Sequence, residues 1–155
     1  MPSWKKPTPE QINRVRELIG RPEQARRFFD QLENPEWLAP LDAMKYFAHP
    51  PKIERDAEHG YIRFPAWPQA KYLLRLAAEF SESVARIMGR MGPTDNPVVI
   101  SDLLSGIGRM SPEIGVRLVS KVEAWADLPA HIILTDRLTA VIRHWATGGQ
   151  MRAAL

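Results

Sequence analysis

The sequence predicts an all-α protein of about eight short helices packed as antiparallel pairs. Three observations predict this class: prolines recur where helices would begin, apolar residues recur at helical spacing, and the intervening turns are short. The chain has 155 residues, of which 45% are hydrophobic and 25% charged, as is typical of one globular domain. We therefore interpret residues 1–155 as a single helical domain.

Proline recurs in one local form, between a polar or aromatic residue and a residue that is most often glutamate. Proline suits the first position of a helix because its missing N–H has no intrahelical partner there. A preceding Ser, Thr or Asn can cap the helix, and a following Glu interacts favourably with the helix dipole. The segments are Thr8-Pro9-Glu10, Arg21-Pro22-Glu23, Asn34-Pro35-Glu36, Asn96-Pro97-Val98 and Ser111-Pro112-Glu113, with Trp67-Pro68-Gln69 as a looser sixth.

Apolar residues spaced three and four apart predict the helices in order. Gly20 is expected to end the first helix, Pro40 to kink or split the third, and Gly148-Gly149 to end the last. Turns of two to five residues between them predict antiparallel neighbours. The expected helices cover about 12–19, 22–32, 37–47, 72–80, 84–91, 98–110, 114–125 and 132–145.

Residues 48–66 lack the helical period. A loop of this length is uncommon in a compact domain unless it is functional or contains local structure. Residues 52–54 and 61–64 can pair as a small hairpin around His59-Gly60, and an irregular loop is the alternative.

Composition excludes several classes of protein. Without cysteine, the chain has no disulfide framework, thiolate zinc site or cysteine nucleophile. No apolar run reaches the roughly 18–20 residues of a membrane span. The first residues lack the apolar stretch of a secretory signal, so we expect a cytoplasmic protein without a membrane partner.

No motif predicts catalysis, a cofactor or a metal. Ser105 lacks the glycine two residues earlier that a nucleophile elbow needs, and Gly106-Ile107-Gly108 follows no strand. The glycines at 106, 108 and 115 instead indicate close helix packing. The possible ligands His49, Glu54, Asp56, Glu58 and His59 have no metal-site spacing and are interpreted as solvated loop charges.

The basic residues leave a nucleic-acid hypothesis open. The first 30 residues carry a net charge of +3, which equals that of the whole chain. Acidic residues alternate with the basic ones, and Glu23–Arg27 is an expected ion pair, so a solvated helix face is favoured. Under the alternative, Arg14, Arg21, Arg26 and Arg27 contact a phosphate backbone.

The aromatic and histidine residues suggest where a protein partner could bind. Trp4 precedes the first helix, and it either folds back onto that helix or marks a contact surface. His49, His59 and Tyr61 lie in the irregular segment and complete the candidate partner-binding set. By contrast, Trp37, Trp67, Trp125 and Trp145 occupy helix faces or helix starts and are expected in the core.

The segment Arg27–Leu41 resembles the opening of a HEAT-like helical region. The resemblance continues through Tyr46-Phe47, His49-Pro50-Pro51, Phe64–Pro68, Tyr72-Leu73 and Thr94–Pro97, and covers about residues 20–125. Such regions stand at the N-terminus of large, mostly uncharacterised bacterial proteins, some linked to phage defence. The resemblance implies a helical scaffold or sensor region of the α-solenoid type, and it transfers no catalytic residue.

We therefore expect a non-enzymatic scaffold or recognition module that binds a protein partner or another part of a longer chain. Nucleic-acid binding is the second hypothesis, and an enzyme acting through residues 48–66 is the third. Residues 150–155 begin a further amphipathic turn that is too short to be stable alone. This predicts that the chain is a piece of a longer protein, and that in the isolated fragment the C-terminal end frays or forms a homodimer contact.

Phosphate binding has a direct test. If the basic residues contact duplex DNA, log affinity should fall with log salt concentration with a slope of about −0.9 per phosphate contact. A gel-shift titration at low salt measures this slope. If the protein binds neither duplex nor single-stranded DNA, the basic residues are ordinary solvated surface residues.

Overall fold

A computed structural model describes residues 3–150. The predicted turn at residues 150–155 and its dimer contact lie almost entirely outside this range. The structure is mostly helical, as the sequence predicts. Its helices are α1 (Pro9–Ile19), α2 (Pro22–Gln31), α3 (Leu38–Ala43), α4 (Pro68–Leu76), α5 (Ser81–Arg90), α6 (Pro97–Ile107), α7 (Pro112–Gly115), α8 (Val119–Ala126) and α9 (His131–Thr147), with 3₁₀ turns at Pro35–Trp37 and Val116–Leu118.

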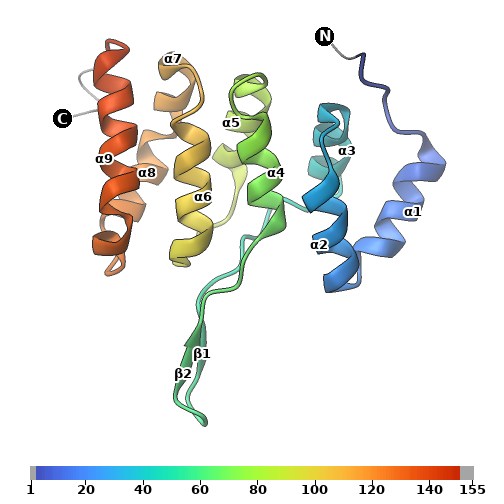
Figure 1. The fold of residues 1–155 in the computed structure, drawn as a ribbon, viewed down its shortest axis with the longest axis horizontal. Helices are drawn as coiled ribbons and strands as arrows, with labels where there is room; N and C mark the ends of the chain where they lie inside the picture. The colour runs from blue at the N-terminus through green and yellow to red at the C-terminus, as the bar shows by residue number, and fades with distance from the viewer. Residues whose placement is uncertain (1–2, 151–155) are drawn as a thin grey trace.

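The helices form two layers (Figure 1). In one layer α2, α4, α6 and α9 pack one against the next, and α1 packs against α2 at the N-terminal end. In the other layer α3, α5 and α8 lie behind this row, and α7 contacts both α5 and α9. The chain passes repeatedly from one layer to the other, and the buried apolar residues of the two layers form one core.

Residues 48–66 contain the small hairpin that the sequence allowed. Strand β1 (Glu54–Asp56) pairs antiparallel with β2 (Tyr61–Arg63), with Arg55 opposite Ile62. Gly60 in the turn has a φ of 69°, a conformation that favours glycine. The hairpin projects away from the two helical layers (Figure 1).

Proline begins helical segments at every position where the recurring form predicts it, at residues 9, 22, 35, 68, 97 and 112. Thr8 forms a capping box with Gln11, while Asn34 and Asn96 accept hydrogen bonds from the amides two residues later. Ser111 makes no such hydrogen bond. Proline therefore marks the start of a helical segment more consistently than a capping side chain does.

Several predicted boundaries are wrong. The expected helix at 114–125 is divided into α7, a 3₁₀ turn and α8. The expected helix at 37–47 ends at Ala43, and Lys45 adopts a φ of 62°. Pro40 lies in the first turn of α3, where a missing N–H costs no helical hydrogen bond.

An aromatic cluster joins α2 to α4. The rings of Phe29, Phe47 and Tyr72 are all buried, with centroids 6.2–6.4 Å apart. The Tyr72 hydroxyl donates to the Asn34 carbonyl at 2.7 Å, and burial raises the pKa of this phenol. The four tryptophans expected in the core, Trp37, Trp67, Trp125 and Trp145, are buried.

Two of the three glycines at 106, 108 and 115 lie in close packing contacts. A Cβ at Gly115 would lie 3.2 Å from Trp145 Nε1 and 3.3 Å from the Ile107 carbonyl oxygen. A Cβ at Gly106 would lie 3.1 Å from Met88 Cε. At Gly108 the nearest atoms would be 3.6 Å away, which is ordinary contact, so the close-packing interpretation is wrong there.

This difference predicts opposite effects of one substitution. Gly115→Ala should lower the free energy of unfolding by about 1–3 kcal/mol because backbone or Trp145 must shift. Gly108→Ala, at a φ of −65°, should be neutral or raise it by up to about 1 kcal/mol. Urea denaturation measures both values. Equal effects would contradict the packing role of Gly115.

Candidate functional site

The hairpin has two chemically different faces. Because successive strand side chains alternate between faces, Glu54, Asp56, Tyr61 and Arg63 share one side. On this polar side, Arg63 Nη1 lies 3.7 Å from Glu54 Oε2. The alternate positions Ile53, Arg55, Ile62 and Phe64 share the other side and together line one wall of a groove.

The base of the hairpin is attached to the helical core by three consecutive side chains. Thr94 Oγ1 donates to the Pro51 carbonyl at 2.7 Å, and Asp95 Oδ1 accepts from the Ile53 amide at 2.9 Å. Asn96 Nδ2 donates to the Pro65 carbonyl at 2.7 Å, on the other strand's side of the hairpin. We call Thr94, Asp95 and Asn96 the hairpin clamp.

Asn96 links the clamp directly to a helix. Its side chain is fully buried, and its Oδ1 accepts from the Val98 amide at 3.1 Å, which caps the start of α6. One amide group therefore fixes both the first turn of α6 and the segment that leaves the hairpin. The groove wall is held in place through this residue.

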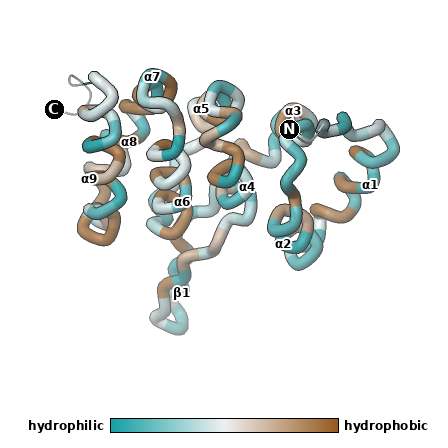
Figure 2. The backbone as a smooth tube through the Cα atoms, turned by 45° about the horizontal axis from the view of Figure 1, so that its top comes forward, coloured by the Kyte–Doolittle hydropathy of each residue, from teal (hydrophilic) through white to brown (hydrophobic). Residues whose placement is uncertain are grey.

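The opposite wall of the groove comes from the α8–α9 connection and the first turn of α9. The groove encloses about 390 Å³ between the hairpin, the start of α6 and this connection. Ile62, Phe64 and Ile133 remain 56%, 45% and 71% exposed although they line it. Figure 2 shows hydrophobic stretches along the hairpin and at the end of α9 nearest to it. Leu128, Pro129, Ala130, Asp95 and Pro97 complete the lining.

These exposed apolar side chains make the groove the strongest candidate site. A two-stranded hairpin is only marginally stable alone, and its apolar face normally packs against another surface. Here that face is partly covered, and Ile132 beside the groove wall is 74% exposed. Exposed apolar surface gathered at a groove is typical of a protein-interaction site.

The sequence predicted this region but named other residues in it. His59 and Tyr61 are exposed, His59 in the turn and Tyr61 on the polar face of the hairpin. His59 Nδ1 lies 3.0 Å from Asp56 Oδ2, and hydrogen bonds from the His59 backbone and ring lower the pKa of Asp56. His49 is exposed before the hairpin. None of the three lines the groove.

The groove residues that we missed carried a recognisable signal. Ile53-x-Arg55 and Ile62-x-Phe64 have the two-residue period of a strand with one apolar face. Ile132-Ile133 places adjacent isoleucines at a helix start, where a 3.6-residue period can bury only part of the pair. Both signals indicate uncovered apolar surface.

Trp4 lies elsewhere on the molecule. It is 39% exposed and lines a small cavity with Glu33, Phe80 and the end of α4. Of the two alternatives for Trp4, this position differs from a return onto the first helix, which supplies no residue to the cavity. Asn34 Nδ2 donates to the Lys5 carbonyl at 2.8 Å and fixes this segment beside the second helix. Trp4 therefore lines a different cavity from the groove.

The structure does not gather the basic residues of the nucleic-acid hypothesis into one site. All four are exposed, Arg14 on α1, Arg26 and Arg27 on α2, and Arg21 just before it. Arg26 Nε lies 3.8 Å from Asp30 Oδ2, whereas the expected Glu23–Arg27 ion pair is not among those formed in the described residues. Arg26 lines a hollow between α2, the segment that leaves the hairpin and α4.

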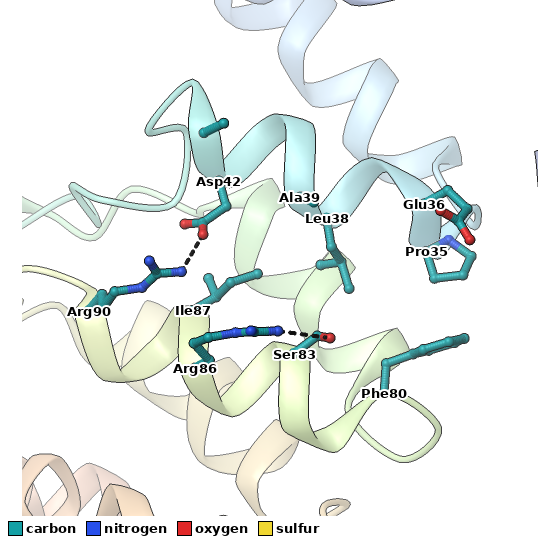
Figure 3. A pocket seen from close by; sticks show the side chains of 11 residues that line it. Pro35, Glu36, Leu38, Ala39, Asp42, Phe80, Ser83, Arg86, Ile87 and Arg90 are labelled. Carbon is teal, nitrogen blue, oxygen red and sulfur yellow. Dashed lines mark hydrogen bonds and ion pairs between the residues drawn. The ribbon is translucent and has the colours of Figure 1, made fainter. Parts of the chain in front are cut away.

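A second cleft of about 620 Å³ separates α3 from α5 (Figure 3). Its floor includes the buried Leu38 and Ile87. Arg90 forms an ion pair with Asp42 across it, and Arg86 Nη2 lies 3.5 Å from Ser83 Oγ. Asp42 and Arg90 therefore pair with each other, and the lining of this cleft is more polar than that of the groove.

Buried ionisable groups do not assemble into catalytic chemistry in the part of the chain described. Desolvation raises the pKa of Asp102, while Lys71 Nζ lies 3.7 Å from its Oδ2. Desolvation lowers the pKa of Lys121, which donates to the Met91 carbonyl at 2.8 Å. Within residues 3–150, no three His, Asp or Glu side chains are placed to hold a metal ion.

Comparisons with known proteins assign no function to this chain. Among the described residues, no helix combines the length and apolar character needed to span a bilayer. No known protein family, curated protein or solved structure matches this chain.

The hairpin clamp should contribute to the free energy of unfolding. Asn96→Ala should lower the free energy of unfolding by about 2–3 kcal/mol, because it removes a helix cap and leaves a buried carbonyl unpaired. It should also speed hydrogen exchange at the Ile53 amide, which the neighbouring Asp95 holds. Urea denaturation and amide exchange measure the two effects.

Asn34→Ala is the matched control, since Asn34 also caps a helical turn and bonds a distant carbonyl, but is more exposed. This substitution should lower the free energy of unfolding by only about 1 kcal/mol and leave hydrogen exchange at the Ile53 amide unchanged. Identical exchange at Ile53 in both variants would contradict the clamp.

Proposed function

We propose that this chain is a helical recognition module that binds a protein partner in the groove between the hairpin and the start of α9. The observation that carries the proposal is the half-covered apolar face of the hairpin, opposite the exposed Ile133. The role is binding rather than catalysis, because the groove is lined mainly by apolar side chains.

The helical layers suit such a role as a HEAT-like array. Paired layers of short helices form an extended, rigid surface on which an inserted segment can be displayed. The row of α2, α4, α6 and α9 supports this interpretation, and the hairpin between α3 and α4 is an insertion into it. The hairpin clamp keeps the inserted groove wall rigid, which reduces the ordering cost of binding.

Nucleic-acid binding is less well supported by the same geometry. A phosphate backbone requires several free cations along a continuous path. Arg26 is paired with Asp30, and Arg14 lies on a different helix from Arg26 and Arg27.

The proposal is tested with a phage-displayed library of random peptides selected on the purified protein. Peptides that bind the groove should bind Ile133→Ser about tenfold more weakly or worse, since burying an isoleucine is worth about 1.5–3 kcal/mol. Because Ile133 is 71% exposed, its replacement should change the free energy of unfolding by less than about 0.5 kcal/mol. Fluorescence anisotropy and urea denaturation measure the two quantities.

Ile142→Ser is the matched control, because Ile142 is an exposed isoleucine on the same helix but not in the groove lining. It should leave peptide affinity unchanged. If selection yields no peptide, or only peptides that bind Ile133→Ser as well as the original protein, the groove is not a recognition site.

A further inference from the structure

The charged side chains of the hairpin are distributed unequally between its two faces. On the polar face, Arg63 is paired with Glu54, and His59 with Asp56. These contacts give the carboxylates of Glu54 and Asp56 partners within the hairpin itself. The groove face carries a single basic side chain, Arg55, among Ile53, Ile62 and Phe64.

Arg55 is exposed and forms no ion pair within residues 3–150. Asp95 also lines the groove, but its Oδ1 is engaged by the Ile53 amide in the hairpin clamp. Accepting this hydrogen bond leaves the negative charge of Asp95 in place, but no ion pair joins Asp95 to Arg55 within residues 3–150. Arg55 therefore presents a guanidinium without an ion-pair partner beside an apolar wall. A partner that covers this wall also removes water from the guanidinium, which is unfavourable unless the partner supplies an anion.

The geometry points to a partner segment that presents two or three large apolar side chains next to a carboxylate, with Arg55 binding the carboxylate. This inference rests on the proposed function and names the chemistry of the partner. The apolar side chains would contact Ile62, Phe64 and Ile133. Segments with a neutral group at the same place bind more weakly, and segments with a basic group are disfavoured by repulsion.

The test uses the peptides selected from the display library, resynthesised with each Asp or Glu changed to Asn or Gln. On the original protein, this change should weaken binding about two- to fivefold at low ionic strength, the size expected of an exposed ion pair. On Arg55→Gln the acidic and amide peptides should bind equally. Arg55→Glu should prefer a lysine-flanked version of the same peptide.

Arg63→Gln is the matched control, because it removes the same charge from the opposite face of the same hairpin. It should retain the preference for acidic peptides. If Arg63→Gln and Arg55→Gln both lose that preference, the preference depends on the net charge of the hairpin and not on Arg55. That result would overturn the inference.

The remaining outcomes separate the inference from the proposed function. Peptides that depend on Ile133 but show no acidic preference overturn the role of Arg55 and leave the groove as a recognition site. The absence of any Ile133-dependent peptide overturns both. Sedimentation that detects a dimer, abolished by Ile133→Ser, would identify a second copy as the occupant and overturn both the partner assignment and the role of Arg55.

Discussion

The fully buried side chain of Asn96 is the constraint on which the arrangement of hairpin and helices depends. Its oxygen caps α6, and its nitrogen bonds the Pro65 carbonyl, so a local helix start and a long-range attachment share one amide. A buried amide that satisfies groups on two elements fixes their relative position, because movement of either element leaves a polar group unpaired. Among the three clamp side chains, Asn96 is thus the one that bonds both a helix start and the segment that leaves the hairpin.

Helix starts could be predicted from the sequence because they are local. Proline selects the first helical position by its own geometry, and this held even where Arg21 and Ser111 supply no side-chain cap. Helix ends were less predictable. The end of α3 at Ala43 depends on the positive φ of Lys45. The sequence did not predict this turn, because a positive φ usually marks a glycine and the residue here is lysine. The break between α7 and α8 likewise interrupts an apolar pattern that reads as continuous.

The candidate site could be predicted only as a region. The hairpin was one of two interpretations of residues 48–66, and His59 and Tyr61 were selected by residue type rather than by strand alternation. The opposite wall of the groove lies more than 60 residues later in the chain, at Ile133. Its approach depends on Thr94, Asp95 and Asn96 reaching carbonyl and amide groups 31–43 residues earlier. No periodicity in a single sequence encodes such distances.

The turn that joins β1 to β2 has a consequence for the evolution of this molecule. Residues 57–60 are all exposed, and their conformation is held by bonds to Asp56, from the Gly60 amide to its carbonyl and from the His59 amide to its side chain. The turn is therefore insulated from the helical core, which is attached to the hairpin at the other end through Asn96. Loops held in this way tolerate changes of length and composition at little thermodynamic cost. Insertions can therefore lengthen this turn while the helical layers stay unchanged.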